Sequence, residues 1–176
     1  MNKKYIFLVG MSWILLGNIV GCGQATRGQT IEKQYDSDQE YATELFEEVV
    51  EALESEDGEA IKELFSPYAI ENSENLDEKI EELIEFYPGC NGGYEMVVPT
   101  HESIEQYGSK EYIIYPKYHV TNDGELYDLR LTVYIENEAE SQKEGIYSMQ
   151  VMTNEAWTEG FKWRNEEDAP GVYVLE

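Results

Sequence analysis

The chain has 176 residues and carries 37 acidic residues against 12 lysines and arginines, so its formal net charge is −25. Hydrophobic residues make up 41% of the chain and charged residues 28%, a globular rather than a disordered composition. This charge excludes a protein that binds nucleic acid by neutralising phosphates, because the sequence has no basic stripe. The length predicts a single domain.

Residues 1–21 have the pattern of a signal peptide. Lys3 and Lys4 precede an apolar stretch, Tyr5 to Leu16, that is too short for a typical membrane span of about 20 residues. Residues 19–22, Ile-Val-Gly-Cys, resemble a bacterial lipobox. The resemblance implies a diacylglyceryl group on the Cys22 thiol and cleavage just before it. We therefore expect a lipoprotein anchored at the outer face of the cell membrane. The alternatives are a plain secretory signal with an incidental cysteine and an uncleaved anchor.

The segment after the lipidated cysteine is rich in glycine and polar residues without apolar periodicity. We expect residues 22–37 to be a tether and residues 38–176 to form one domain. If Cys22 carries lipid, Cys90 is the remaining cysteine, so an intramolecular disulfide is excluded. We expect Cys90 to be buried, since a free cysteine packs as a small hydrophobic residue.

Three helices are expected at the start of the domain. The capping box Ser37-x-x-Glu40 predicts a helix that runs to about Ser55. Apolar residues at 61, 64 and 65 predict a short second helix that stops before Pro67. Asn75 can cap a third helix, whose apolar stripe ends at residue 87.

After Gly93 the pattern changes to that of strands. Tyrosines and β-branched residues become frequent, as is typical of sheets. The expected strands cover residues 96–98, 112–120, 126–135 and 146–152, with 161–163 and 172–175 as short additions.

Asp123-Gly124 is a strong two-residue hairpin signal, and it fixes the register of the strands on either side. It places His119 opposite Asp128 and Lys117 opposite Arg130, on the polar face. Pro116 lacks an N–H, so its strand should lie at an edge or contain a bulge. The expected core face consists of Tyr112, Ile114, Tyr118, Val120, Tyr127, Leu129, Leu131, Val133 and Ile135.

Residues 54–66, which join the first two helices, resemble the same passage of nuclear-transport-factor-2-like (SnoaL-like) domains. The motif at 145–148, Gly-Ile-Tyr-Ser, resembles lipobox-bearing members of unknown function. The resemblance covers about residues 38–153 and implies a cone-shaped fold. The fold class expected here is α+β, with three N-terminal helices packed on a curved antiparallel sheet of four or more strands.

Enzymes of that superfamily place an inward aspartate, sometimes with histidine or tyrosine, to move protons. His119 with Asp128 is the best such pair in this sequence, but the register puts both on the face away from the core, where a surface ion pair explains them. His101-Glu102 lacks the second histidine that a zinc-protease motif requires. We therefore assign no catalytic residue, no metal site and no cofactor.

An apolar cavity under the helices is the remaining candidate site. Ordinary packing of the sheet against the helices explains the same residues more simply. The residues that would line the cavity are Tyr112, Tyr118, Tyr127 and Met149.

The sequence favours a non-enzymatic module that binds a small ligand or an envelope protein at the outer face of the membrane. Two alternatives stay open: a small SnoaL-like lyase or isomerase, and an accessory lipoprotein that recruits an envelope enzyme. The expected partners are the membrane, through the lipid anchor, and an unidentified ligand or envelope protein, with no nucleic acid. The oligomeric state is left undetermined.

Overall fold

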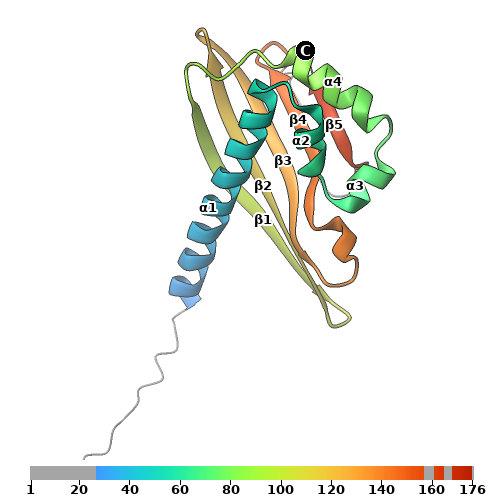
Figure 1. The fold of residues 1–176 in the computed structure, drawn as a ribbon. Coiled ribbons are helices and arrows are strands. Elements are labelled where there is room, and N and C mark those ends of the chain that lie inside the picture. The colour runs from blue at the N-terminus through green and yellow to red at the C-terminus, as the bar shows by residue number, and fades with distance from the viewer. Residues whose placement is uncertain (1–26, 157–160, 165–167, 176) are drawn as a thin grey trace, which may run out of the picture.

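The computed structural model describes residues 27–156, 161–164 and 168–175 (Figure 1). Its helices are α1 (Arg27–Glu54), α2 (Gly58–Glu63), α3 (Pro67–Asn72) and α4 (Leu76–Phe86). Its strands are β1 (Tyr94–Gln106), β2 (Ser109–Asn122), β3 (Glu125–Asn137), β4 (Gly145–Thr153) and β5 (Gly171–Leu175). A short 3₁₀ helix, η1 (Ser141–Lys143), joins β3 to β4.

The expectation of three helices is wrong, because the structure has four α-helices in its described part. The additional helix, α3, begins at Pro67, in the first turn where the missing N–H costs nothing. Ser66 caps it, with its hydroxyl oxygen accepting a hydrogen bond of 3.1 Å from the Ala69 N–H. The first helix begins at Arg27 rather than at Ser37, so the expected capping box lies inside α1.

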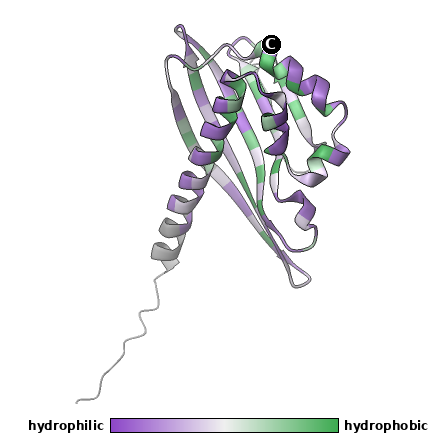
Figure 2. Cartoon of the chain, viewed as in Figure 1, coloured by the Kyte–Doolittle hydropathy of each residue, from purple (hydrophilic) through white to green (hydrophobic). Residues whose placement is uncertain are grey.

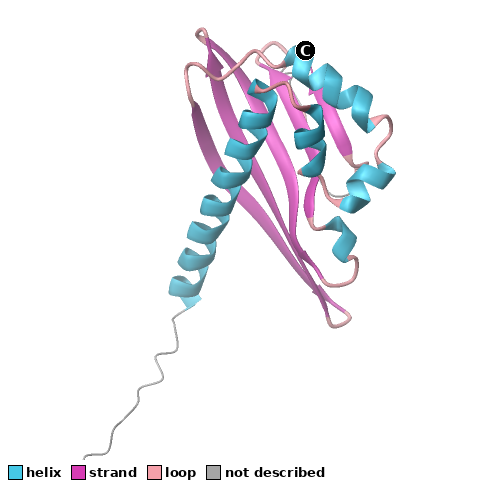
Figure 3. Cartoon of the chain, viewed as in Figure 1, coloured by secondary structure: helices cyan, strands magenta, loops and turns pink. Residues whose placement is uncertain are grey.

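The expectation of an antiparallel sheet is also wrong, because the sheet is mixed. Its order is β1-β2-β3-β4-β5, and β5 runs parallel to β4 whereas the other neighbours are antiparallel (Figure 3). A parallel neighbour requires a crossover connection, and residues 154–170 supply it. The expected strand at 161–163 belongs to this crossover and is not a strand.

The register expected around Asp123-Gly124 is confirmed. His119 pairs with Asp128 and Lys117 with Arg130, and both turn residues have positive φ angles, 49° and 88°. These angles fit the type I′ turn that hairpins prefer.

Register shifts interrupt three of the strand pairings, and two of them affect residues for which the sequence made a prediction. Pro116 lies in β2, an interior strand, opposite a register shift in β1 between Val97 and Thr100. β2 is therefore not an edge strand, and the irregularity lies in its neighbour β1, where two residues oppose Pro116, rather than in β2 itself. A second shift between Tyr112 and Ile113 leaves Ile135 as an extra residue in β3, so Ile135 is 36% exposed and does not join the core face.

The helices cover one face of the sheet and enclose the main core (Figure 1). Figure 2 shows hydrophilic residues on the side of α1 that faces away from the sheet. At the centre of the core the Phe46 ring of α1 stacks on the Tyr118 ring of β2, with centroids 3.8 Å apart. Burying side chains of this size stabilises the fold by about 1.5–3 kcal/mol each.

The opposite face of the sheet carries a second, smaller apolar cluster formed by Ile113, Tyr115, Tyr134 and Tyr147. The crossover packs beside it: the Trp163 ring lies 5.4 Å from the ammonium of Lys117. Both faces of the sheet are thus covered in part. Among the described helices, none is long and apolar enough to cross a membrane.

Candidate functional site

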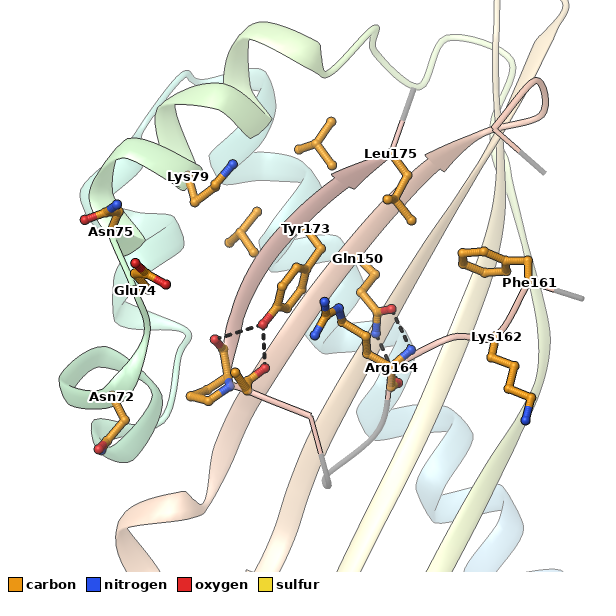
Figure 4. A pocket seen from close by; sticks show the side chains of 14 residues that line it. Asn72, Glu74, Asn75, Lys79, Gln150, Phe161, Lys162, Arg164, Tyr173 and Leu175 are labelled. Carbon is orange, nitrogen blue, oxygen red and sulfur yellow. Dashed lines mark hydrogen bonds between the residues drawn. The ribbon is translucent and has the colours of Figure 1, made fainter. Parts of the chain in front are cut away.

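A hollow of about 620 Å³ lies beside β5, between the α3–α4 junction and the crossover (Figure 4). Residues 172–175 of β5 all line it. Since successive residues of a strand point to opposite faces, a hollow lined by four in a row follows the outer edge of the strand. We call it the β5 hollow. Its walls are Asn72, Glu74, Asn75 and Lys79 on one side, and Gln150, Phe161, Lys162, Arg164, Ala169 and Pro170 on the other.

β5 begins at Gly171, beside the α3–α4 junction. Gly171 has a φ of +130°, a conformation that favours glycine, and a Cβ there would lie 3.4 Å from the Ser73 side chain. Val172, the next residue, is 3% exposed and packs in the main core. The start of β5 is therefore held against the α3–α4 junction, which keeps the two walls of the hollow together.

A buried glutamine holds the opposite wall. Gln150 is 1% exposed, and its amide oxygen accepts a hydrogen bond of 2.8 Å from the Arg164 N–H. Its amide nitrogen donates a bond of 3.1 Å to the Arg164 carbonyl. This reciprocal pair satisfies both polar ends of a side chain that would otherwise be costly to bury. It fixes the crossover backbone to β4 at Arg164.

The fixed backbone lets the Arg164 side chain cover the Tyr173 ring. The guanidinium carbon lies 4.0 Å from the ring centroid, a cation–π distance. The Tyr173 hydroxyl donates a hydrogen bond of 2.6 Å to the Ala169 carbonyl (Figure 4). Burial raises the pKa of Tyr173, and Asp168 adds to the rise while Arg164 opposes it. The side chain is therefore a neutral platform at physiological pH.

The lining of the hollow is richer in basic side chains than the chain as a whole. Lys79, Lys162 and Arg164 line it against one acid, Glu74. Neighbouring carboxylates share part of this charge, since Lys79 pairs with Glu82 and Arg164 lies 3.8 Å from Asp168. The described lining contains no serine, cysteine or histidine. The arrangement is suited to holding an anionic group rather than to nucleophilic chemistry.

The residues expected to line a cavity all lie in the main core: Tyr112, Tyr118, Tyr127 and Met149. The Tyr118 hydroxyl donates to the Ala42 carbonyl at 2.6 Å, and the Tyr127 hydroxyl to the Gly89 carbonyl at 2.7 Å. Burial raises the pKa of each of the three tyrosines. None of these four residues lines the β5 hollow.

One inward carboxylate was missed by the sequence analysis. Asp38 of α1 is 5% exposed and accepts hydrogen bonds from the Tyr112 hydroxyl and, at 3.1 Å, from the Gln34 amide. His101 of β1 approaches the same carboxylate at 3.6 Å. Helical spacing could have revealed this, because Asp38 lies one helical turn before Ala42 and so on the same buried face of the helix.

The expected His119–Asp128 pair forms on the face away from the helices. Asp128 accepts from His119 and also pairs with Lys117 at 2.8 Å. His119 and Asp128 border a smaller hollow of about 290 Å³ with Tyr127 and Met152. Both carboxylate oxygens are thus engaged, as in the surface ion pair that the sequence analysis described.

The remaining sequence candidates give no further site. Cys22 lies outside the described residues. Cys90 is a free thiol of intermediate burial, and burial raises its pKa. Within the described ranges, no group of three or more histidine, cysteine or acidic side chains is arranged to hold a metal ion.

The model of a domain of unknown function, DUF5104, matches residues 48–154, more than half of the chain. The chain therefore belongs to the DUF5104 family. The match gives no indication of a nuclear-transport-factor-2-like relationship or of a lipoprotein. No curated protein matches the chain. The matched region supplies Asn72, Lys79 and Gln150 to the β5 hollow, whereas β5 and Arg164 follow it.

Proposed function

We propose that this DUF5104 protein is a non-enzymatic binding module that takes its ligand in the β5 hollow. The proposal rests on the contacts that hold the side chains of that hollow in place. A buried Gln150 holds the Arg164 backbone, and Arg164 in turn covers Tyr173. Such a combination of a fixed cation and an aromatic face is what small-ligand and peptide sites use to orient a bound group.

The charge distribution supports an acidic ligand. The chain carries a formal net charge of −25, yet three basic side chains line this hollow, two of which, Lys79 and Arg164, also lie beside a carboxylate. An anionic ligand is repelled by most of the surface and attracted at this place, which favours one binding position over others.

The proposed location is the outer face of the cell membrane, with lipid on Cys22. The lipobox-like residues 19–22 support this part of the proposal. Two acyl chains give a stable anchor, because each buried methylene contributes about 0.8 kcal/mol. An acidic domain is repelled by an anionic lipid surface, so the anchor would hold the module at the membrane without its lying flat on it.

Native mass spectrometry of the full-length chain in detergent micelles tests the binding function. The expected result is a bound mass that is lost on denaturation and is lost from the Arg164→Ala and Tyr173→Ala variants. Lys110→Ala is the matched control, since Lys110 is an exposed cation paired with Glu136 and lies outside the hollow. No bound mass in the wild-type protein, or a mass that both hollow variants retain, contradicts the proposal.

Proton transfer at Asp38 is a second candidate, in line with a small lyase or isomerase of the SnoaL-like kind. The specific observation is the buried carboxylate between the Tyr112 hydroxyl and the His101 imidazole, since general acid–base work needs such a group. Its test is whether Asp38→Asn, which keeps the size of the side chain, abolishes turnover of a substrate while Gln150→Leu does not. Turnover that Asp38→Asn leaves unchanged contradicts this candidate.

A further inference from the structure

The two edges of the sheet are built differently. The edge strand β1 carries three glutamates, at 95, 102 and 105, together with Pro99 and a bulge. Charges, proline and bulges on an edge strand prevent other strands from pairing with it. The opposite edge strand, β5, reads Gly-Val-Tyr-Val-Leu and has neither a charge nor a proline. β5 itself therefore lacks the charges, the proline and the bulge of β1, while α4 packs against it on the helix side.

The outer edge of β5 also keeps its backbone groups available. Within the described residues, the backbone hydrogen bonds of β5 are those of its pairing with β4, and no turn or loop bond reaches residues 171–175. Tyr173, Val174 and Leu175 are partly exposed and line the β5 hollow. An edge strand that faces a hollow offers both a row of main-chain donors and acceptors and room for a partner.

Cations stand on both sides of this edge. Lys79 comes from α4, on the helix side, whereas Lys162 and Arg164 come from the crossover on the other side (Figure 4). Alternate side chains of an added strand point to opposite faces, so acidic residues on either face of that strand would meet a cation. The pattern fits an acidic extended segment.

A second copy of this chain is the less suitable occupant. Pairing two β5 edges would bring the same three cations of each copy together, and each copy adds a formal charge of −25. Like charges on both partners oppose such a dimer.

We infer that an extended acidic peptide segment of another protein binds by adding a strand to the outer edge of β5. This inference rests on the proposed function and specifies its ligand. Main-chain hydrogen bonds to β5 would supply affinity, and Lys79, Lys162 and Arg164 would select acidic side chains. Tyr173 and Leu175 would contact the apolar residues between them.

The test begins with the full-length chain in detergent micelles and a displayed library of short random peptides. The expected selected peptides alternate acidic and apolar residues. Synthetic copies are then N-methylated at one position at a time, which removes one main-chain donor. Strand addition predicts that every second N-methyl group weakens binding about tenfold or more, because alternate N–H groups face the neighbouring strand. The positions between them should tolerate the change.

Charge reversal provides the second arm. Lys162→Glu with Arg164→Glu should weaken binding of the selected peptides about tenfold or more, whereas Lys110→Glu should leave it unchanged. An N-methyl scan without the period of two, or binding that survives the charge reversal, overturns the inference. Concentration-dependent dimers that this double variant abolishes would overturn it in favour of a second copy.

Failure of the inference is distinguishable from failure of the proposed function. A bound mass that depends on Arg164, found together with no selected acidic peptide, retains the β5 hollow as a binding site and rejects the peptide. If neither a bound mass nor a selected acidic peptide is found, both the proposed function and the peptide inference are rejected.

Discussion

Replacing Gln150 by leucine tests how the β5 hollow is held together. Gln150 is 1% exposed, and its amide makes both hydrogen bonds to the Arg164 backbone, at 2.8 and 3.1 Å. Each net hydrogen bond contributes about 0.5–1.5 kcal/mol, and the substitution also leaves the Arg164 N–H and carbonyl without this partner. We expect the free energy of unfolding to fall by about 2 kcal/mol, measured by urea denaturation.

Ser148→Ala is the matched control for this change. Ser148 lies two residues earlier on the same face of β4 and is also 1% exposed, but its hydroxyl has no hydrogen-bond partner among the described residues. Its removal should change stability by less than about 0.5 kcal/mol. Hydrogen–deuterium exchange at the Arg164 amide should be faster in Gln150→Leu than in the wild-type protein, and unchanged in Ser148→Ala. Equal stability of the two variants, with unchanged exchange at Arg164, would refute the role given to Gln150.

Four further outcomes are expected. Gly171→Val should lower the free energy of unfolding by about 1–3 kcal/mol in the same urea assay, because a φ of +130° strains a β-branched residue; equal midpoints would contradict this. Asp38→Ala should cost about 1–3 kcal/mol and Asp38→Asn less, since the amide oxygen still accepts from the Tyr112 hydroxyl; the reverse order would rule out that bond. Burial raises the pKa of Tyr87 to about 12 from 10.0, so the free energy of unfolding should fall as pH rises from about 10 to 12. The fall should be less steep in Tyr87→Phe, and identical slopes of the two proteins in a pH series would contradict this. Cys22→Ala should release the protein from the membrane fraction, and unchanged retention would exclude lipidation.

The sign of the pH effect follows from proton counting. A tyrosine whose pKa is raised by folding keeps its proton in the native state after the unfolded chain has lost it. The native state then binds more protons above pH 10, so its stability is complete below that pH and declines above it. Tyr118 and Tyr127, whose pKa values burial also raises, add to the decline at higher pH.

Local signals in the sequence predicted the local parts of the fold. The Asp123-Gly124 turn fixed the β2–β3 register, because a two-residue turn leaves one pairing that keeps both apolar sets on the same face. Ile135 was misplaced because a bulge inserts a residue that alternation alone does not reveal. Pro67 was read as the end of a helix, although Ser66 before it also fits a helix start.

The β5 hollow was beyond local reasoning because its walls come from distant parts of the chain. Lys79 and Arg164 line the same hollow only because β5 lies parallel to β4, a placement that no periodicity predicts. One partial signal existed: Gln150 interrupts an apolar strand, and a polar residue in such a run needs a buried hydrogen-bond partner. The partner, the Arg164 backbone, carries no sequence signature.

Amide chemical shifts of the isotope-labelled full-length chain test whether this protein binds through the β5 hollow. On addition of a selected acidic peptide, the shift changes should concentrate at residues 171–175, at Gln150 and at Arg164. Shifts confined to the surroundings of Asp38 in α1 and His101 in β1 would contradict binding in the hollow and move the function to the buried carboxylate.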